Sequence, residues 1–501
     1  MISSELSKSK PQELEQYFSQ FRSHIIGQDQ TFESPYGEQK IIYTDWTASG
    51  RLYRPIEDKI CNVFGPFVAN THTETTVSGT AMTKAYHKAR HIIKAHVNAN
   101  DDDILICSGN GMTGVINKFQ RILGLKIPEN LKEFTKIPDE MRPVVFVSHM
   151  EHHSNQTTWL ETMAKVEVVP PNEDGLFCLK NLETLLHQYK DCTIKIASVV
   201  GGSNVTGIQI PHHDVAKLMH QHGGVCFVDF ACSAPYVDMN MHPEDENAQL
   251  DAIFFSPHKF LGGPGTSGVL VFNKKLYKNM VPDCPGGGTV SWTNPWGEHK
   301  YIDNIEDRED GGTPGFLQTI KSALSIKLKE EMGVTNMLQR EHELVSIIFE
   351  KLEGIPNINI LAGQHKDRLG VISFYIDDLH FNLAVKLLND KFGIQTRGGC
   401  SCAGTYGHFL LHVDQQMSHE LTNEISIGDL VRKPGWIRMS IHPTTTNAEI
   451  EFVCDGIIDL AKHHNTWAMD YEYSKCNNEF VHKSLVGKDC SGPNIADWFE
   501  M

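Results

Sequence analysis

Several side chains that can do chemistry stand directly after predicted β-strands. Asp229 follows the apolar run VCFV, and Lys259 follows AIFFS within the stretch SPHKFLGGPG. His152 and His153 follow VVFVSHM, and Asn204 follows KIASVVGG. In open α/β sheets, ligands bind outside the carboxyl ends of the strands. A carboxylate, an amine, two imidazoles and an amide at one such edge indicate a ligand site rather than packing alone.

A turn suited to phosphate follows another predicted strand. The run DILICS is followed by Gly109, Asn110 and Gly111, and then by a predicted helix. Free backbone N–H groups at a helix N-terminus, reached past glycine, bind phosphate well. Taken alone, the stretch is more typical of a tight strand-to-helix turn than of a phosphate site.

Two cysteines lie one residue apart in the stretch TRGGCSCAGTYGH, residues 396–408. Cys400 and Cys402 are compatible with half of a metal site, a redox pair, or one nucleophile with an inert neighbour. These residues do not decide between the three by themselves. His408 and His412 would complete a zinc site if the metal interpretation were right.

The elements that must position these groups alternate along the first two thirds of the chain. Six short runs that are apolar on both faces are typical of buried, mostly parallel strands: 103–108, 144–148, 195–200, 225–230, 252–256 and 268–272. Helical segments such as 112–123, 179–190 and 214–223 separate many of them. The pattern predicts an α/β fold with a mostly parallel sheet. From about residue 315, long helices and a few strands predict a smaller α+β domain.

Bulk composition excludes several classes of protein. The chain has 501 residues, of which 40% are hydrophobic and 21% charged, and its net charge is −17. Nucleic acids and anionic membranes attract basic surfaces, so neither is expected as a partner. The N-terminus lacks an apolar signal segment, and no run of 18 apolar residues exists. The 12 cysteines are scattered, so reduced thiols and a cytoplasmic location are expected.

One cofactor uses this set of polar groups. Pyridoxal 5′-phosphate (PLP) needs a lysine for a Schiff base and a carboxylate to keep its pyridine nitrogen protonated. It also needs a phosphate cradle and a flat group against its ring. Lys259 and Asp229, each at the end of a predicted buried strand, fit the first two roles.

An ordered set of motifs then resembles a known family. The motifs are YTDWTASG, NTHT, CSGNGMTG, MEHHSN, GGSNVTGI, VDFACSAPY, SPHKFLGGPG, GGGTV, DGGTPG, RGGCSCAG and WIRMSIH. From about residue 41 to 460, the sequence resembles the class V aminotransferase group of PLP enzymes. Within this group it is similar to the cysteine desulfurase and selenocysteine lyase branch. The resemblance implies PLP-transferase fold type I, with a large domain and a smaller C-terminal α+β domain.

The resemblance also implies a division of the chain. The expected segments are an N-terminal extension packed on the small domain (1–40), a PLP-binding large domain (41–312), a small domain (313–465) with an insertion at about 404–432, and a C-terminal tail (466–501). The insertion would form a lid over the pocket or cover a dimer edge.

Site residues carry over from the resemblance by position. Lys259 would form the Schiff base and later move the substrate α-proton, Asp229 would bind the pyridine nitrogen, and His152 would stack on the ring. The other cofactor-binding positions implied are Asn204 beside the ring hydroxyl or the substrate, Asn110, Gly111, Ser256 and His258 at the phosphate, and Thr289 at the phosphate of a second subunit. A homodimer with shared active sites follows from that role of Thr289.

The substrate-side positions implied are Arg438 for the carboxylate of a small amino acid, Arg397 as a second arginine, and Ala48. Cys402 lies five residues after Arg397, where the family has its nucleophile. Its thiolate would take sulfur from the substrate to give a persulfide and alanine, and the reaction leaves room for a sulfur-acceptor protein.

Two departures from the pattern keep alternatives open. Cys232 stands where the family usually has a glutamine that reaches the ring oxygen, and the insertion precedes Arg438. One alternative is another class V reaction without a catalytic thiol, such as transamination, epimerisation or β-elimination. A more remote alternative is a non-catalytic metal-binding protein that uses the Cys400 and Cys402 loop. With PLP as cofactor, no resident metal is expected.

Overall fold

The computed structural model describes residues 11–71, 73–135, 137–138, 141–475, 477–486 and 495–500. These residues form two compact units. The sheet unit comprises Ser49–Ser203 and Gln209–Val334. The C-terminal unit comprises the described parts of Met1–Ala48, Asn204–Ile208 and Thr335–Met501.

The domain limits expected at residues 41, 313 and 466 stay predictions. His72 of the NTHT motif, residues 1–10 of the expected extension, and residues 476, 487–494 and 501 of the expected tail lie outside the described residues.

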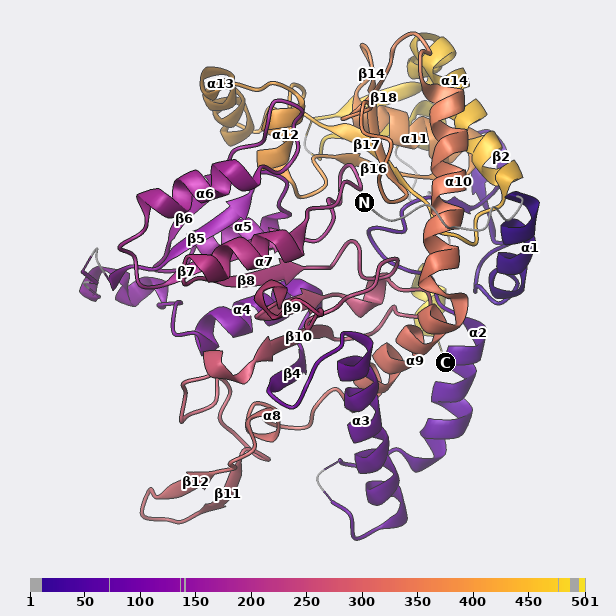
Figure 1. Ribbon diagram of the computed structural model, residues 1–501. Coiled ribbons are helices and arrows are strands. Elements are labelled where there is room, and N and C mark those ends of the chain that lie inside the picture. Colours follow the sequence, from indigo (N-terminus) through magenta and orange to yellow (C-terminus); the bar gives the residue numbers. More distant parts are fainter. Residues whose placement is uncertain are drawn as a thin grey trace. The chain divides into compact units, whose positions relative to one another are not determined.

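A seven-stranded, mostly parallel sheet forms the centre of the sheet unit (Figure 1). Its strands, in spatial order, are β4 (Asp103–Ser108), β10 (Gly268–Asn273), β9 (Ala252–Phe255), β8 (Val225–Asp229), β7 (Lys195–Val200), β5 (Val144–Ser148) and β6 (Lys165–Val169). Five of these strands, β6, β5, β7, β8 and β9, pair in parallel. The α/β fold class predicted from the sequence is confirmed. All six predicted runs form strands, and β6 is an addition.

The direction of the strands decides where their polar ends gather. β10 is antiparallel to both β4 and β9, so β4 runs in the same direction as β9. The carboxyl ends of β4, β5, β7, β8 and β9 therefore lie at one edge of the sheet. Five of the side chains expected to bind a ligand end or follow these strands: Asn110, His152, Asn204, Asp229 and Lys259.

Helices cover the sheet, and amphipathic ones such as α4 and α6 bury an apolar stripe there. The helices of the sheet unit are α2 (Arg54–Lys59), α3 (Val77–His96), α4 (Gly111–Ile122), α5 (His153–Leu160), α6 (Leu179–Gln188), α7 (His212–Gln221), α8 (Ile305–Arg308) and α9 (Phe316–Met332). Apolar residues of α4 share one buried cluster with Ile106, Val145, Phe227 and Leu270 of the strands. Helices α6 and α7 lie beside each other along the sheet (Figure 1).

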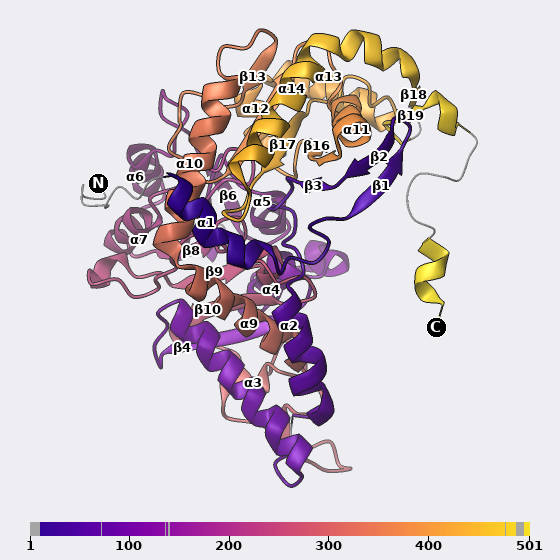
Figure 2. The same ribbon diagram turned by 90° about the vertical axis from the view of Figure 1, so that its right-hand side faces the viewer.

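Two further features belong to the sheet unit. The long helices α3 and α9 pack along each other (Figure 2). Strands β11 (Val290–Thr293) and β12 (His299–Tyr301) form an antiparallel hairpin that projects from the unit in Figure 1.

An antiparallel four-stranded sheet forms the centre of the C-terminal unit. Its order is β13 (Ile358–Ile360), β14 (Val371–Ile376), β17 (Trp436–Ser440) and β16 (Arg397–Gly399). The remaining strands of this unit are β1 (Thr31–Ser34), β2 (Gly37–Lys40), β3 (Ile42–Tyr43), β15 (Ile394–Gln395), β18 (Tyr471–Ser474) and β19 (Glu479–His482). Its helices are α1 (Pro11–Arg22), α11 (Phe381–Phe392), α12 (Gly404–Leu410), α13 (Gln415–Ser426) and α14 (Asn447–Trp467), with most of α10 (Val334–Leu352).

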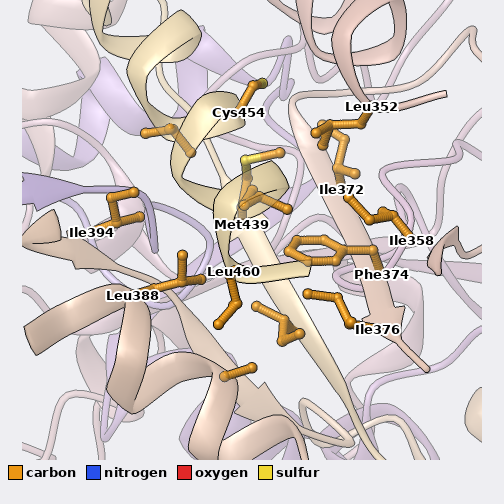
Figure 3. Packing of buried hydrophobic residues seen from close by; sticks show 14 of the residues in the cluster. Leu352, Ile358, Ile372, Phe374, Ile376, Leu388, Ile394, Met439, Cys454 and Leu460 are labelled. Carbon is orange, nitrogen blue, oxygen red and sulfur yellow. The ribbon is translucent and has the colours of Figure 1, made fainter. Parts of the chain in front are cut away.

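A buried cluster of apolar side chains holds the C-terminal unit together. Figure 3 shows Phe374 of β14, Met439 of β17, Leu388 of α11 and Cys454 of α14 within it. The N-terminal helix α1 joins the same unit, since Arg22 Nη1 donates to the Thr444 carbonyl at 3.1 Å. No helix among the described residues has the length and apolar character needed to cross a membrane.

Candidate active site

A glycine turn of the kind that can bind phosphate lies at the N-terminus of α4. Gly109 and Gly111 have φ angles of 61° and 62°, values that glycine adopts most readily. A Cβ at Gly111 would lie 2.9 Å from Ser256 Oγ, so a larger residue would fill the space beside the hydroxyl. Ser256 Oγ accepts a hydrogen bond from the Met112 amide at 2.7 Å. Asn110 is exposed at the N-cap of α4 and makes no side-chain cap hydrogen bond. The predicted residues Gly111 and Ser256 are thus brought together.

Asp229 supplies a carboxylate at the end of β8. It is 2% exposed, and its Oδ1 accepts the Ala231 amide at 2.8 Å. Burial raises its pKa to about 6, while the amide bond and the charge of Lys259 act in the opposite direction. Asp229 is the register partner of Phe254 on β9, the strand that Lys259 follows, so the two predicted cofactor residues stand at the ends of neighbouring strands.

Lys259 closes a short 3₁₀ turn, Pro257–Lys259, that follows β9. Its neighbour His258 is partly buried, and burial, with a smaller effect of Lys259, lowers the imidazole pKa to about 4. His258 is therefore neutral at neutral pH. The backbone after this turn packs directly against Gly50. A Cβ at Gly50 would lie 1.9 Å from the Phe260 carbonyl oxygen, so the position requires glycine.

His152 is positioned by a buried carboxyl that the sequence analysis did not single out. His152 caps α5, and its Nδ1 accepts the Ser154 amide at 3.1 Å, which places the proton of the neutral ring on Nε2. The preceding residue, Glu151, is fully buried. Its Oε1 accepts from the Val200 amide at 2.9 Å, and its Oε2 accepts from Asn155 Nδ2 at 2.7 Å. Glu151 thus ties together the ends of β5 and β7 and the start of α5.

Burial raises the pKa of Glu151 to about 8, with a smaller contribution from Asp229, while the hydrogen bonds lower it. The signal in the sequence was a glutamate directly after a buried strand, in the motif MEHHSN.

Lys329 is a second residue that the sequence analysis did not single out. It lies on α9 and is 1% exposed. Its Nζ donates to the carbonyls of Ala234 and Val237 at 2.7 and 2.5 Å, and it lies 3.2 Å from His96 Nε2. Three acceptors match the three protons of an ammonium group.

The same ammonium lies 5.6 Å from the centre of the Phe260 ring, directly after Lys259. Lys329 therefore holds the loop that follows Asp229 and contacts the segment that carries Lys259. Burial lowers its pKa to about 7, and the acidic neighbours Asp238 and Glu330 counteract this. A lysine on an otherwise amphipathic helix gave no signal in the sequence.

Two further predicted positions of the sheet unit have local partners. Cys232, at the place of the usual glutamine, is 4% exposed, and its Sγ lies 3.6 Å from the Ser203 carbonyl oxygen. Thr289 is buried, and its hydroxyl donates to the Gly286 carbonyl at 2.7 Å, which closes the turn GGGT.

Arg438, on β17 of the C-terminal unit, is paired with a carboxylate of the chain itself. It is 2% exposed, and its Nη2 lies 2.6 Å from Asp45 Oδ1. Its Nη1 donates to the Asn204 carbonyl at 3.2 Å. Its Nε has no hydrogen-bond partner among the described residues.

Arg397 is the register partner of Arg438 on β16 and is exposed, so the structure brings the two predicted arginines together. Ala48 ends the turn that Asp45 begins, because its amide donates to the Asp45 carbonyl at 2.9 Å.

Asn204 joins Arg438 to the cysteine loop. Its Nδ2 donates to the Ser401 carbonyl at 2.7 Å, while its own carbonyl accepts from Arg438. Its Oδ1 is buried without a hydrogen-bond partner among the described residues. Asn204 thus fixes the position of the loop that carries Cys402.

The cysteine loop has an unusual backbone. Ser401 and Cys402 have φ angles of 50° and 56°, in the left-handed region that residues with a Cβ rarely adopt. Such conformations cost roughly 1–3 kcal/mol each and persist where surrounding contacts enforce them, often at functional sites. Cys402 is partly exposed, as its proposed role requires.

The alternative zinc site at this loop is not assembled. His408 is engaged by the Gly404 carbonyl at Nδ1 (2.7 Å) and by Ser418 Oγ at Nε2 (2.9 Å). Within the described ranges, the one group of three or more potential metal ligands is Glu183, His187 and His222. The insertion itself forms α12 and α13.

Comparison with known proteins decides the family. The sequence profile described as aminotransferase class-V matches residues 42–453. The chain belongs to this family. The family is PLP-dependent, so the chain is an enzyme of that class, and the resemblance inferred from the motifs is confirmed.

Two of the similar relatives are named probable cysteine desulfurases. A probable cysteine desulfurase from Halalkalibacterium halodurans is 26% identical over 371 residues, which are 72% of this chain and 84% of that relative. One from Staphylococcus epidermidis is 28% identical over 375 residues, 74% of this chain and 85% of the relative.

Two solved structures have a similar fold. An apo cysteine desulfurase from Thermococcus onnurineus NA1 superposes with a TM-score of 0.69 at 20% identity, covering 88% of this chain and 98% of that one. The S-sulfonic acid form of the cysteine desulfurase CsdA from Escherichia coli gives a TM-score of 0.67 at 20% identity, covering 91% and 100%.

The contacts of Lys329 lead to a prediction. In Lys329→Met, the carbonyls of Ala234 and Val237 lose a buried donor, which costs about 1–3 kcal/mol of stability for each group left unsatisfied. Backbone amides of residues 231–237 should therefore exchange hydrogen faster in a mass-spectrometric measurement.

Lys327→Met is the matched control on the same helix, because its side chain is 57% exposed and pairs with Glu330 at the surface. Faster exchange at 231–237 in the control as well, or none in Lys329→Met, would contradict the role of Lys329.

Proposed function

We propose that this chain is a PLP-dependent cysteine desulfurase in which Cys402 accepts the sulfur. Asn204 gives the strongest support, because it connects a buried arginine suited to a substrate carboxylate with a strained loop that carries a thiol. The cysteine desulfurase names of the relatives point in the same direction. Selenocysteine is a second substrate to assay, since its selenium occupies the place of the sulfur.

The residues of the sheet unit fit PLP by their chemistry. Gly111 leaves room beside Ser256 Oγ at a helix N-terminus, where a phosphate is favoured. Asp229 would bind the pyridine nitrogen, His152 would stack on the ring, and Lys259 would hold the aldehyde carbon. Asn110 and the neutral His258 would complete the phosphate contacts. Asn204, from the C-terminal unit, would lie beside the ring hydroxyl or the substrate. Bound PLP supplies an electron sink for charge that develops at the substrate Cα.

The chain's own groups would then do the following. Arg438 and Arg397 bind and orient the substrate carboxylate, for which a guanidinium is suited, and Ala48 lines the substrate side. Lys259 Nζ takes the proton from the substrate Cα. The Cys402 thiolate attacks the substrate sulfur, so a new S–S bond forms as the Cβ–S bond breaks. The electron pair of the broken bond goes to Cβ, which gains a proton, and Lys259 Nζ returns a proton to Cα. Alanine then leaves, and Cys402 carries the persulfide.

Replacing the thiol tests this proposal. Cys402→Ser should lower sulfide release from cysteine in the presence of a reductant by roughly 10³-fold or more, since a nucleophile cannot be replaced by its neighbours. PLP should stay bound, as its visible absorbance reports. Cys400→Ser is the matched control and should keep most of the activity. Sulfide release by Cys402→Ser at the wild-type rate, or keto acid as the product, would favour a class V reaction without a catalytic thiol.

The raised pKa of Asp229 predicts a pH dependence of cofactor binding. The carboxyl is ionised above about pH 6 and loses its charge as the pH falls through that value. A protonated pyridine nitrogen needs the charged form, so the affinity for PLP should fall below about pH 6. The measurement is a PLP titration of cofactor-free protein between pH 5 and 8.

Asp229→Asn is the control for this titration. It should bind PLP more weakly and lack the step near pH 6, while any step due to the ligand's own phosphate stays. A step of equal size in both proteins would contradict the assignment of Asp229.

The proposed partners are a small amino acid, a second copy of this chain, and a sulfur-acceptor protein that takes the persulfide. In the dimer, Thr289 would reach the phosphate held by the other subunit. To do so, its hydroxyl must give up the hydrogen bond that it donates to the Gly286 carbonyl and donate to the phosphate instead. The insertion that forms α12 and α13 stays a candidate for a lid or a dimer cover.

Subunit mixing tests the shared site. Thr289→Val and Lys259→Ala should each be weakly active or inactive alone. A mixed dimer has one site with an intact Lys259 and an intact Thr289 from its partner, so mixing should restore activity. Mixed Thr289→Val and Thr289→Ala chains are the control and should stay at the level of either alone. No recovery on mixing with Lys259→Ala would mean that Thr289 only closes its own turn.

A further inference from the structure

Three potential metal ligands converge at the adjacent helices α6 and α7 of the sheet unit. Glu183 and His187 lie on α6, and His222 is the C-cap residue of α7. One ligand atom from each lies within 4.8 Å of the other two. The rings of His187 and His222 meet edge to face, with centroids 5.1 Å apart and an interplanar angle of 80°. The group belongs to none of the residues assigned to the proposed reaction.

The chemistry of the group suits a borderline-soft divalent ion. Two imidazoles and one carboxylate form the set that holds zinc in open, three-ligand sites. The spacing i, i+4 places Glu183 and His187 on the same face of α6. Around a zinc ion, neighbouring ligand atoms lie about 3.3 Å apart, given bonds of about 2.0 Å. Rotamer changes of the exposed Glu183 and His187 side chains and of the half-buried His222 side chain are enough to close the present spacing.

The side chains of the group are not engaged elsewhere in the described part of the chain. Neither Glu183, His187 nor His222 has an ion pair or a side-chain hydrogen bond there. Other histidines nearby are engaged: His220 contacts the Asn247 carbonyl at 2.7 Å and Asp251 at 2.9 Å, and His213 contacts the Ala248 carbonyl at 2.8 Å. In the described part of the chain, the three grouped residues thus bring ligand atoms that have no other hydrogen-bond or ion-pair partner within 4.8 Å of one another.

We propose that Glu183, His187 and His222 bind one divalent transition-metal ion of the zinc type, with water at the remaining positions. The ion cross-links α6 to the C-terminal end of α7. His222 lies three residues before β8, the strand that ends at Asp229. The bound ion thus stabilises the start of the strand that carries the central carboxylate. The site is independent of the proposed sulfur chemistry.

Binding is tested on the PLP-loaded protein with ZnCl₂ alone as the probe. Diffraction data collected on both sides of the zinc absorption edge should place an ion between Glu183, His187 and His222. Calorimetric titration should give one equivalent of sites that His187→Gln and His222→Gln each weaken by roughly 10-fold or more, as expected when a ligand is lost. Zinc should raise the melting temperature of the wild type more than that of either variant.

His91→Gln is the matched control, because His91 is an exposed histidine of the same unit on α3. It should bind zinc as the wild type does. Melting temperatures without zinc establish that each variant is folded. If the ion is found only at cysteine thiols, or if the His187 and His222 variants bind as tightly as His91→Gln, binding is adventitious and the proposal is wrong.

Discussion

Asp229 places a carboxylate inside the sheet, and much of the surrounding structure accommodates that charge. A buried carboxylate without partners is costly, so it persists only where donors and cations support it. Its strand, β8, lies between β7 and β9, and the Ala231 amide and the charge of Lys259 favour its ionised form. Neighbouring Glu151 has a still higher pKa, in part because of Asp229, and is held by four hydrogen bonds. Those bonds satisfy Glu151, whereas Asp229 accepts one hydrogen bond, from Ala231, among the described residues, which leaves its carboxylate available to a cation or a protonated ring.

The same constraint explains the buried ammonium of Lys329. It satisfies two loop carbonyls just beyond Asp229, and those carbonyls have no strand to pair with. A neutral side chain of equal size would fill the space but leave both carbonyls unsatisfied. Lys329 therefore stabilises the shape of the loop, and through the loop the direction of the Asp229 carboxylate.

The sheet could be predicted from the sequence because its strands are apolar on both faces. β6 was missed because KVEVV alternates with charged residues, as suits a strand with a neighbour on one side only. The identities of Lys259, Asp229 and Cys402 followed from motifs. Contacts between distant segments could not be predicted in this way. Nothing local in the sequence connects Asn204 to Ser401, or Asp45 to Arg438. Lys329 was missed for the same reason, because its partners lie about ninety residues away.

The pairing of Arg438 with Asp45 affects how a substrate would bind. A guanidinium that is 2% exposed cannot remain without an anion, because removing one partner of a buried pair typically costs several kcal/mol. Asp45 occupies one side of the guanidinium, and Nε is left without a partner in the described structure. Under the proposed function, a substrate carboxylate either shares the guanidinium with Asp45 or replaces it. In both cases the free energy gained from the ion pair between Arg438 and the substrate is offset by the weakening of the ion pair between Arg438 and Asp45. Arg438 would then contribute more to the choice of a carboxylate-bearing substrate, and to its orientation, than to net affinity.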